Sequence, residues 1–277
     1  MTPDPRVTLA RSDLAADSLE GLIKAERFAH PIAMQTIAPL AALRTEGRAG
    51  AEQADQLLFG EVFEVLEAKD GFAWGQARRD GYVGFVEAAC LSSELLAPTH
   101  RIGAPSTFAF AEPSIRAAPF GPLSLNALVT VLEESGSFVR VAGAGWIPRR
   151  HLSPIGCFEA DPATVAQSLV GAPYLWGGRS SLGLDCSGLI QQALHACGLA
   201  CPRDTDQQSL LGVAIGPAEH RRGDLIFWRG HVGMMLDDQR LIHANAHRMA
   251  VAIEPLHEAI ARIEASGAGP PTVRRRL

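Results

Sequence analysis

Apolar and polar residues alternate along two stretches of the chain that follow one plan. Residues 61–92 read EVFEVLEAKDGFAWGQARRDGYVGFVEAACLS, and residues 127–153 read ALVTVLEESGSFVRVAGAGWIPRRHLS. Each contains an alternating strand, the letters VLE, a polar turn with glycine, a second alternating strand, another glycine-containing turn and a short strand ending in Leu-Ser. Such alternation, with a turn about every 8 to 12 residues, is typical of small antiparallel barrels or sandwiches. We therefore predict two copies of one small β unit.

Proline and glycine mark the borders of these two units. They gather in LLAPTHRIGAPST at residues 95–107 and in HLSPIGCFEADPAT at residues 151–164, and clusters of this kind separate folded segments. A stretch from Asp13 to Phe28 precedes the first unit and has a helical appearance. The chain is accordingly divided into an N-terminal helical extension at 1–28, a first β unit at 29–97, a second at 98–156 and a different domain at 157–277.

After residue 157 the apolar pattern becomes helical. Asp161 and Pro162 make a good N-cap and first-turn pair, so we expect a short helix that runs to Gly171. A second helix is expected from Cys186 to a stop at Gly198. Its apolar stripe consists of Leu189, Ile190, Ala193, Leu194 and Cys197. Three strands follow, at 223–228, 231–236 and 241–246, and a helix ahead of an antiparallel sheet indicates an α+β domain.

The second helix places Cys186 in its first turn, where chemistry is expected. Unpaired backbone N–H groups and the helix dipole favour a thiolate at that position over a thiol. A base is also required, and His231 and His243 lie in consecutive strands. If Leu236 pairs with Arg240 across the turn, His231 and His243 share one face, with Gly233 leaving room for the rings. The sequence thus predicts a nucleophile, a base and a residue that orients the base.

Composition narrows the class of protein without changing this site. The 277 residues, 47% of them hydrophobic, carry a net charge of −5, which gives no electrostatic footprint for nucleic acid or anionic lipid. No run of about 18 apolar residues is present, and the first residues lack the apolar run of a signal peptide. Five cysteines, an odd number, fit a reducing compartment better than a disulfide framework. We expect a cytoplasmic protein with neither nucleic-acid nor membrane partners.

Six ordered motifs then resemble a known family. YLWGG, LDCSGLIQ, PRDTDQQ, GDLIFW, HVGMML and LIHA, spread over roughly residues 157–255, are similar to the NlpC-type cysteine peptidases of the papain-like fold, which cleave bacterial cell-wall peptides. The paired upstream units resemble bacterial SH3-like barrels. Together they point to the γ-D-glutamyl-L-diamino acid endopeptidase subgroup, whose first barrel walls off the site. The resemblance implies Cys186 as nucleophile, His231 as base, His243 as its polar orienter and Tyr174 as a hydroxyl near the oxyanion.

The subgroup also holds the free amino end of its peptide with carboxylates. By motif these are Asp185 and Asp204, with Ser187 and Thr205 as hydrogen-bonding neighbours, although Thr205 stands where the subgroup is expected to have serine. Tyr82, in DGYVGF, matches the tyrosine contributed by the first barrel. An acidic residue from that barrel is expected to join it, and the candidates are Glu52 and Glu61.

Three function classes follow from these residues. The first is an endopeptidase for murein-derived peptides, which would serve peptide recycling in the cytoplasm. The others are an amidase or acyltransferase on the same scaffold, and a silent peptide-binding protein, against which the cysteine and both histidines argue. Cys197 and Cys201 lack a nearby pair of histidines that would complete a zinc site, so no metal or cofactor is expected. The preferred diamino acid and the oligomeric state stay open.

Overall fold

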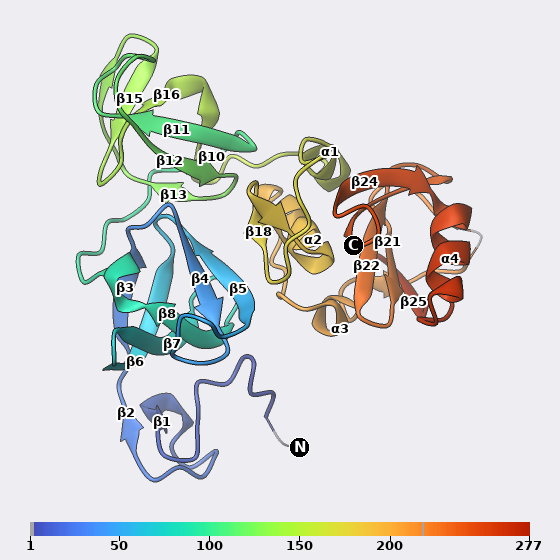
Figure 1. Ribbon diagram of the computed structural model, residues 1–277, viewed down its shortest axis with the longest axis horizontal. Helices are drawn as coiled ribbons and strands as arrows, with labels where there is room; N and C mark the ends of the chain where they lie inside the picture. Colours follow the sequence, from blue (N-terminus) through green and yellow to red (C-terminus); the bar gives the residue numbers. More distant parts are fainter. Residues whose placement is uncertain (1–2, 218) are drawn as a thin grey trace. The chain divides into compact units, whose positions relative to one another are not determined.

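The structure, a computed structural model, describes residues 3–217 and 219–277. The chain divides into two compact units, Met1–Ile155 and Gly156–Leu277 (Figure 1). The border falls within the proline- and glycine-containing segment at 151–164 that the sequence marks as a boundary. The N-terminal unit is built from strands, and the C-terminal unit combines helices with a sheet, as the α+β layout predicts.

The N-terminal segment is not the predicted helical extension. It contains β1 (Ala15–Ala16), the three-residue 3-10 helix η1 (Asp17–Leu19) and β2 (Phe28–Ala29), and β1 pairs with β2 in parallel. Leu9, Leu14 and Ala16 are buried around Trp74 of the following sheet. Packing against that tryptophan orders these apolar residues in extended backbone, so tertiary contacts override the local helical appearance.

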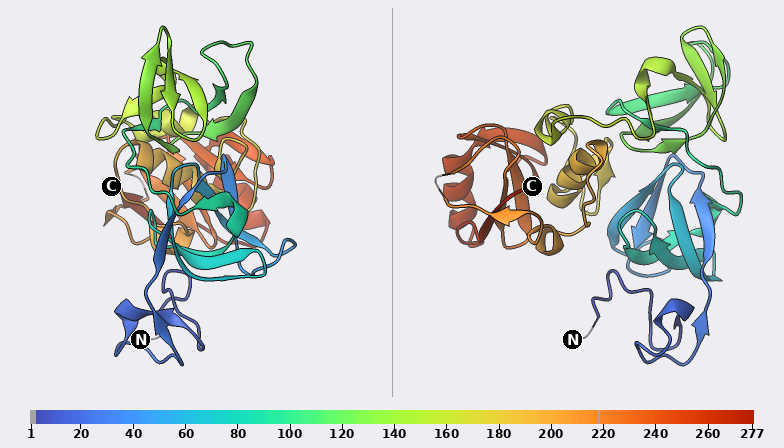
Figure 2. Two further views of the ribbon diagram at one scale, coloured as in Figure 1. Left: turned by 90° about the vertical axis from the view of Figure 1, so that its left-hand side faces the viewer. Right: turned by 180° about the vertical axis from the view of Figure 1, so that it is seen from behind.

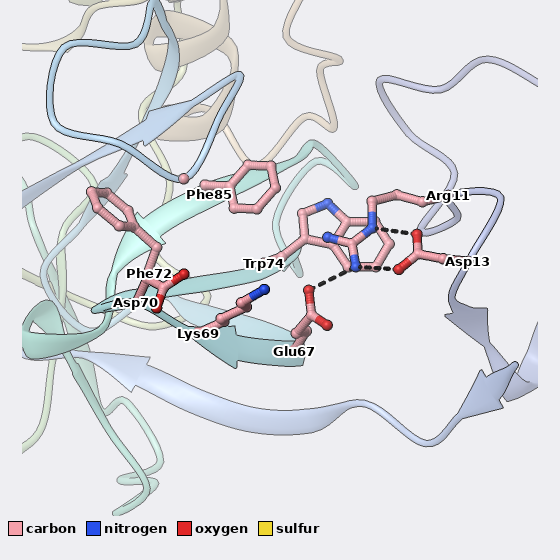
Figure 3. A pocket seen from close by; sticks show the side chains of 9 residues that line it. Arg11, Asp13, Glu67, Lys69, Asp70, Phe72, Trp74 and Phe85 are labelled. Carbon is pink, nitrogen blue, oxygen red and sulfur yellow. Dashed lines mark hydrogen bonds and ion pairs between the residues drawn. The ribbon is translucent and has the colours of Figure 1, made fainter.

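Arg11 fastens this segment to the first sheet. Its guanidinium lies 4.1 Å from the centre of the Trp74 ring, within cation–π range. The same group forms ion pairs with Asp13 at 3.1 Å and with Glu67 at 2.7 Å (Figure 3). One arginine therefore links the extension to the sheet through both stacking and charge.

The first lobe of the N-terminal unit is a seven-stranded sheet in the order β5-β4-β8-β7-β6-β3-β9. Leu43, Leu57, Phe63 and Val86 are fully buried in its core, at the alternate positions that the sequence pattern predicts. The elements are β3 (Ile32–Thr36), β4 (Leu40–Arg44), β5 (Gln53–Leu58), β6 (Val62–Lys69), β7 (Phe72–Ala77), β8 (Val83–Glu87), η2 (Ala88–Cys90) and β9 (Leu91–Ser92).

The second lobe repeats this plan in two sheets, β12-β11-β16-β15-β14 and β13-β10-β17. β11 pairs with β12 and β16 just as β4 pairs with β5 and β8, and each lobe ends in three strands, a 3-10 helix and a short strand. The elements are β10 (His100–Ile102), β11 (Ser106–Phe110), β12 (Pro119–Ser124), β13 (Leu128–Val129), β14 (Val131–Ser135), β15 (Phe138–Val141), β16 (Gly145–Pro148), η3 (Arg149–His151) and β17 (Leu152–Pro154).

The strand orders of both lobes are those of open sheets. In the described residues the expected closed barrels appear as one seven-stranded sheet and a pair of sheets. The chain crosses between the second lobe's two sheets at Thr130, which separates β13 from β14. Leu58 and Phe59, at the end of β5, pack in the core of the second lobe, and the Leu128 N–H donates to the Phe59 carbonyl at 2.9 Å. The lobes therefore share part of their core.

The C-terminal unit carries a six-stranded sheet in the order β20-β25-β21-β22-β23-β24. Figure 2 shows this unit, in yellow to red, from two further sides. Helix α2 lies against β22 and β23, and helix α4 packs its Leu256, Ala259 and Ile263 on buried sheet residues. The elements are α1 (Pro162–Gln167), β18 (Arg179–Ser180), β19 (Gly183–Leu184), α2 (Cys186–Ala196), α3 (Thr205–Gln208), β20 (Val213–Ala214), β21 (Leu225–Trp228), β22 (His231–Met235), β23 (Arg240–Asn245), β24 (Ala250–Pro255), α4 (Leu256–Ala265) and β25 (Val273–Arg276).

The local signals predicted the helix starts correctly. Asp161 is the N-cap of α1 and accepts a hydrogen bond from the Ala163 N–H at 2.9 Å, with Pro162 as the first helical residue. The helix ends at Gln167, four residues before the expected Gly171. Within the described ranges, no helix has the length and apolar character that crossing a bilayer needs.

Candidate active site

Cys186 begins helix α2 and is almost fully buried, with 7% of its surface exposed. Asp185 is the N-cap, and its carboxylate accepts from the Gly188 N–H at 2.7 Å. Gly188 is required here because a Cβ on it would lie 2.1 Å from the Gly178 carbonyl oxygen. The loop before the helix can therefore press directly against the first turn and enclose the thiol.

The two histidines meet on neighbouring strands. Met234 pairs with Ile242 and Met235 with Leu241, which is the register expected from pairing Leu236 with Arg240. His231 Nε2 lies 2.8 Å from His243 Nδ1. The predicted juxtaposition of the rings is therefore present in the structure.

Gly233 has a different purpose from the one predicted. A Cβ on Gly233 would meet the Leu241 side chain at 2.9 Å. The space that the missing side chain leaves is therefore filled by a core leucine, and it is not kept open for the histidine rings.

A carboxylate contacts the second histidine of the pair, through the ring nitrogen that does not face the first. His243 Nε2 lies 2.6 Å from Glu254 Oε1, and the Arg262 guanidinium of α4 binds the same oxygen. His243 is fully buried and Glu254 is 6% exposed. Sequence reasoning missed Glu254 and Arg262. Extending the hairpin register to a third strand would have brought Glu254 opposite Leu241, on the same face as the histidines.

The thiol lies at the start of β22, the strand that begins with His231. Cys186 Sγ is 4.0 Å from the Gly230 carbonyl oxygen, and the Val232 N–H also points to it. Among the described residues, His231 Nδ1 makes no hydrogen bond. The His231 ring packs against Trp228 with the ring centres 5.7 Å apart. Nε2 of His231 therefore faces His243, and Nδ1 is available for a further hydrogen bond.

Burial favours the neutral forms of the Cys186 thiol and the His231 imidazole. Desolvation, reinforced by the Asp185 charge, raises the pKa of Cys186 to about 12, although N–H groups of Val232 and Ser187 act in the opposite direction. Burial, then the neighbouring His243 and the positive Arg262, together lower the pKa of His231 to about 3. The expectation of a thiolate stabilised by the helix terminus is therefore wrong for this state, because desolvation outweighs the helix N–H groups.

Asp185 is engaged by the protein itself. Arg203 binds both of its oxygens, with Nη1 donating to Oδ1 at 3.0 Å and Nη2 to Oδ2 at 2.5 Å, and the Gly177 N–H donates to Oδ2 at 2.9 Å. Ser187 Oγ donates to Asp185 and accepts from Arg203. This geometry gives Asp185 and Ser187 a supporting role in the first turn of α2. A buried carboxylate needs such internal partners, and the sequence could not name Arg203 as one.

The remaining candidates of the C-terminal unit are more accessible. Asp204 is the N-cap of α3 without a side-chain capping bond, Thr205 is the first residue of that helix, and both are half-buried. Tyr174 is also half-buried, and burial together with Cys186 raises the pKa of its hydroxyl to about 12. Tyr174 therefore stays protonated and can donate a hydrogen bond near the thiol.

The candidates of the first lobe lie in the N-terminal unit. Tyr82 is 7% exposed and packs in the core of its sheet. Glu61 is buried, forms an ion pair with Arg79 and accepts from the Leu58 N–H at 3.0 Å. Glu52 is exposed on the approach to β5. Of the two carboxylates, Glu52 is the one at the surface, and the contribution of this lobe to a substrate site stays a prediction.

A buried thiol at a helix N-terminus, with a histidine pair on the adjoining sheet, defines the site of a cysteine peptidase of the papain-like type. Family profiles agree: residues 171–267 match the NlpC/P60 family and residues 43–91 match the bacterial dipeptidyl-peptidase SH3 domain. The protein is a cysteine peptidase with an NlpC/P60 domain and a bacterial SH3 domain.

Curated relatives include two bacterial enzymes named gamma-D-glutamyl-L-lysine dipeptidyl-peptidase. The one from Bacillus cereus is 35% identical over 105 residues, which are 35% of this chain and 32% of the relative. The one from Bacillus subtilis is 27% identical over 232 residues, 74% of this chain and 76% of the relative. A crystal structure of an NlpC/P60 family protein from Bacillus cereus, 20% identical, shares the fold with a TM-score of 0.75 over 88% of this chain and 99% of that one.

Proposed function

We propose that the protein hydrolyses the γ-D-glutamyl–diamino acid bond of short murein-derived peptides that have a free N-terminal L-Ala. The observation that carries the proposal is the buried thiol of Cys186 against the Gly230 carbonyl, at the start of the strand whose His231 is hydrogen-bonded to His243. The names of the two Bacillus relatives support the bond that is cleaved. The neutral thiol and imidazole favour a mechanism in which proton transfer accompanies attack, without a preformed ion pair.

The reaction takes two stages. His231 Nδ1 accepts the thiol proton while Sγ bonds to the γ-glutamyl carbonyl carbon, and the hydroxyl of Tyr174 donates to the oxyanion. The C–N bond then breaks, the amine of the diamino acid leaves with the proton held by His231, and a thioester remains. A water molecule, deprotonated by His231, attacks the thioester and restores the thiol with release of the L-Ala-γ-D-Glu carboxylate.

Asp204 supports the preference for a free amino end. It follows Arg203, whose guanidinium binds Asp185 beside the nucleophile, so its carboxylate belongs to a segment attached to the first turn of α2. A charged ammonium bound there would gain a charge-assisted hydrogen bond of about 1.5 to 3 kcal/mol. We also propose that Tyr82 and Glu52 of the first lobe contribute to substrate binding, and that the second lobe is a diverged SH3-like copy.

The physiological role proposed is recycling of small imported peptides in the cytoplasm. It rests on the odd number of cysteines and on a substrate preference for short peptides with a free amine. Both features suit released fragments better than an intact, cross-linked wall.

Mass spectrometry of L-Ala-γ-D-Glu-diamino acid tripeptides, with L-Lys or meso-diaminopimelate in the third position, tests the reaction. We expect release of the free diamino acid, and acetylation of the L-Ala amine should lower kcat/KM about 10- to 150-fold. Asp204→Asn should make the kcat/KM values for the free and the acetylated tripeptide nearly equal. Asp206→Asn, on the exposed side of the same short helix, should leave the difference between them unchanged. Equal turnover of free and acetylated tripeptide by the unmodified protein would show that the amino end is not read.

A further inference from the structure

The histidine pair is linked to two residues that the triad does not include. We propose that Glu254, held by Arg262, is a positioning residue that fixes His231 and His243 in the tautomers that let His231 serve as base toward Cys186. The inference deepens the proposed function, since it rests on cysteine peptidase chemistry at this site. It assigns a task to a strand residue and a helix residue that lie behind the reacting groups.

Two hydrogen bonds determine which ring nitrogen of each histidine carries the proton. Ionised Glu254 can only accept, so His243 Nε2, 2.6 Å away, carries the proton and donates it. Neutral His243 then has its lone pair on Nδ1, and His231 Nε2, 2.8 Å from that nitrogen, must donate in turn. Neutral His231 is left with its lone pair on Nδ1. That is the nitrogen without a hydrogen bond, available for the thiol proton.

Arg262 balances the charge of the carboxylate. Hydrogen bonding from His243, and then the charge of Arg262, lower the pKa of Glu254 to about 2, so Glu254 is ionised at all working pH values. A second proton on His243 would make it a donor from both nitrogens, and His231 would be forced to accept at Nε2, which places its proton on Nδ1. Arg262 donates to the same Glu254 oxygen that His243 contacts, so the carboxylate has a charged partner other than the histidine.

The charged and titratable groups around His231 come from several elements. His243 is contributed by β23, Glu254 by β24, Arg262 by α4 and Cys186, with its neighbour Asp185, by the start of α2. Burial lowers the pKa of His231 most, the neighbouring His243 and then Arg262 also lower it, and the Glu254 charge raises it. Glu254 also stabilises the positive charge that appears on the histidine pair once the thiol proton has moved.

Kinetics of two substitutions test the role through opposite effects. Glu254→Gln should lower kcat about 100-fold with KM changed less than about twofold, because proton transfer is impaired and no substrate contact is lost. The acid limb of kcat/KM, set by His231, should move to lower pH in Glu254→Gln and to higher pH in Arg262→Gln. Glu258→Gln, on the exposed side of α4, is the matched control and should leave the profile unchanged.

Nitrogen-15 NMR of histidine-labelled protein reads the tautomers without any substrate. Both rings of the unmodified protein should carry hydrogen on Nε2 at pH 7, and Glu254→Gln should give a mixture. Hydrogen on Nδ1 of neutral His231, or a wild-type kcat in folded Glu254→Gln, would overturn the inference. Acid limbs that move in the same direction in both variants would do so as well. If the tripeptides are not cleaved but the rings have the expected tautomers, the proposed substrate is wrong and the positioning role stands.

Discussion

Asp185 and Glu254 are both buried carboxylates bound by an arginine, yet they serve opposite sides of the site. Asp185 is saturated by fixed donors, namely Arg203 and the N–H groups of Gly177 and Gly188. Glu254 instead shares one oxygen between Arg262 and the ring of His243, which can change its protonation. Burial and pairing alone therefore do not tell a structural carboxylate from one coupled to the reaction. The two kinds of carboxylate differ in whether one of their partners is itself a titratable side chain.

The largest effect is expected from removing Cys186, the proposed nucleophile. Cys186→Ala should reduce turnover of the tripeptide at least about 10³-fold, since no other group can form the thioester. The unfolding transition should stay close to that of the unmodified protein because a small buried side chain is replaced by a smaller one. Cys90→Ala, in the N-terminal unit, is the control and should retain activity. Activity in Cys186→Ala would remove the premise that these carboxylates serve catalysis.

Removal of the arginine beside each carboxylate should lower the free energy of unfolding by different amounts. Arg203→Ala leaves Asp185 without its ion-pair partner in a site where the Arg203 side chain is only 1% exposed, and loss of one partner of such a pair costs about 3 to 5 kcal/mol. The Arg262 side chain is 26% exposed. Arg262→Ala should lower the free energy of unfolding less, because Glu254 keeps its hydrogen bond with His243. Urea unfolding of the two variants measures this difference. An equal loss in both would contradict the distinction between them.

The alkylation of Cys186 should be strongly pH dependent. Its pKa is raised to about 12, so the thiol is protonated at neutral pH, and the thiolate fraction rises about tenfold per pH unit below that value. Labelling with iodoacetamide, located by peptide mapping, should accelerate about 100-fold from pH 7 to pH 9 without levelling off. N-acetylcysteine amide, with a pKa near the ordinary value of about 8.5, should level off above it. A plateau between pH 6 and 7 would instead reveal a preformed ion pair with His231.

The smallest effect is expected at a third arginine that is partly exposed. Arg11 binds Asp13 and Glu67 and stacks on Trp74, with 28% of its side chain exposed. Arg11→Ala should lower the unfolding free energy of the N-terminal unit by about 1 kcal/mol, the scale of a partly exposed cation–π contact. Arg11→Lys should restore part of it. A loss as large as that of Arg203→Ala would mean that exposure does not set the energy of these pairs.

Much of the C-terminal unit could be predicted because its signals are local. Asp161 and Pro162 fix the start of α1, and the short turn between His231 and His243 limits the register to one that brings the rings together. The repeat in the N-terminal unit was readable for a similar reason, since alternation and turns recur with the same spacing. Cys186 was found because helix start and apolar stripe both lie within a few residues of it.

The rest depended on contacts between distant residues. The extension at 13–28 looked helical, but Trp74, far along the chain, orders it in extended backbone. Arg203 is 18 residues from the carboxylate it binds, and Arg262 reaches Glu254 from a separate helix. The direction of the Cys186 pKa shift also escaped prediction, because it is set by how completely the site is buried, a quantity that no short motif contains.

The shared core of the two β lobes bears on how such proteins can be taken apart or recombined. The repeat ends near Pro98 in the sequence, but Leu58 and Phe59 of the first copy complete the interior of the second. A gene fragment that stops at Pro98 would leave these two apolar side chains in water, and a transplanted second copy would lack two residues of its interior. Each sequence repeat is therefore shorter than the segment that folds, and shuffling this N-terminal unit between enzymes calls for moving both lobes together.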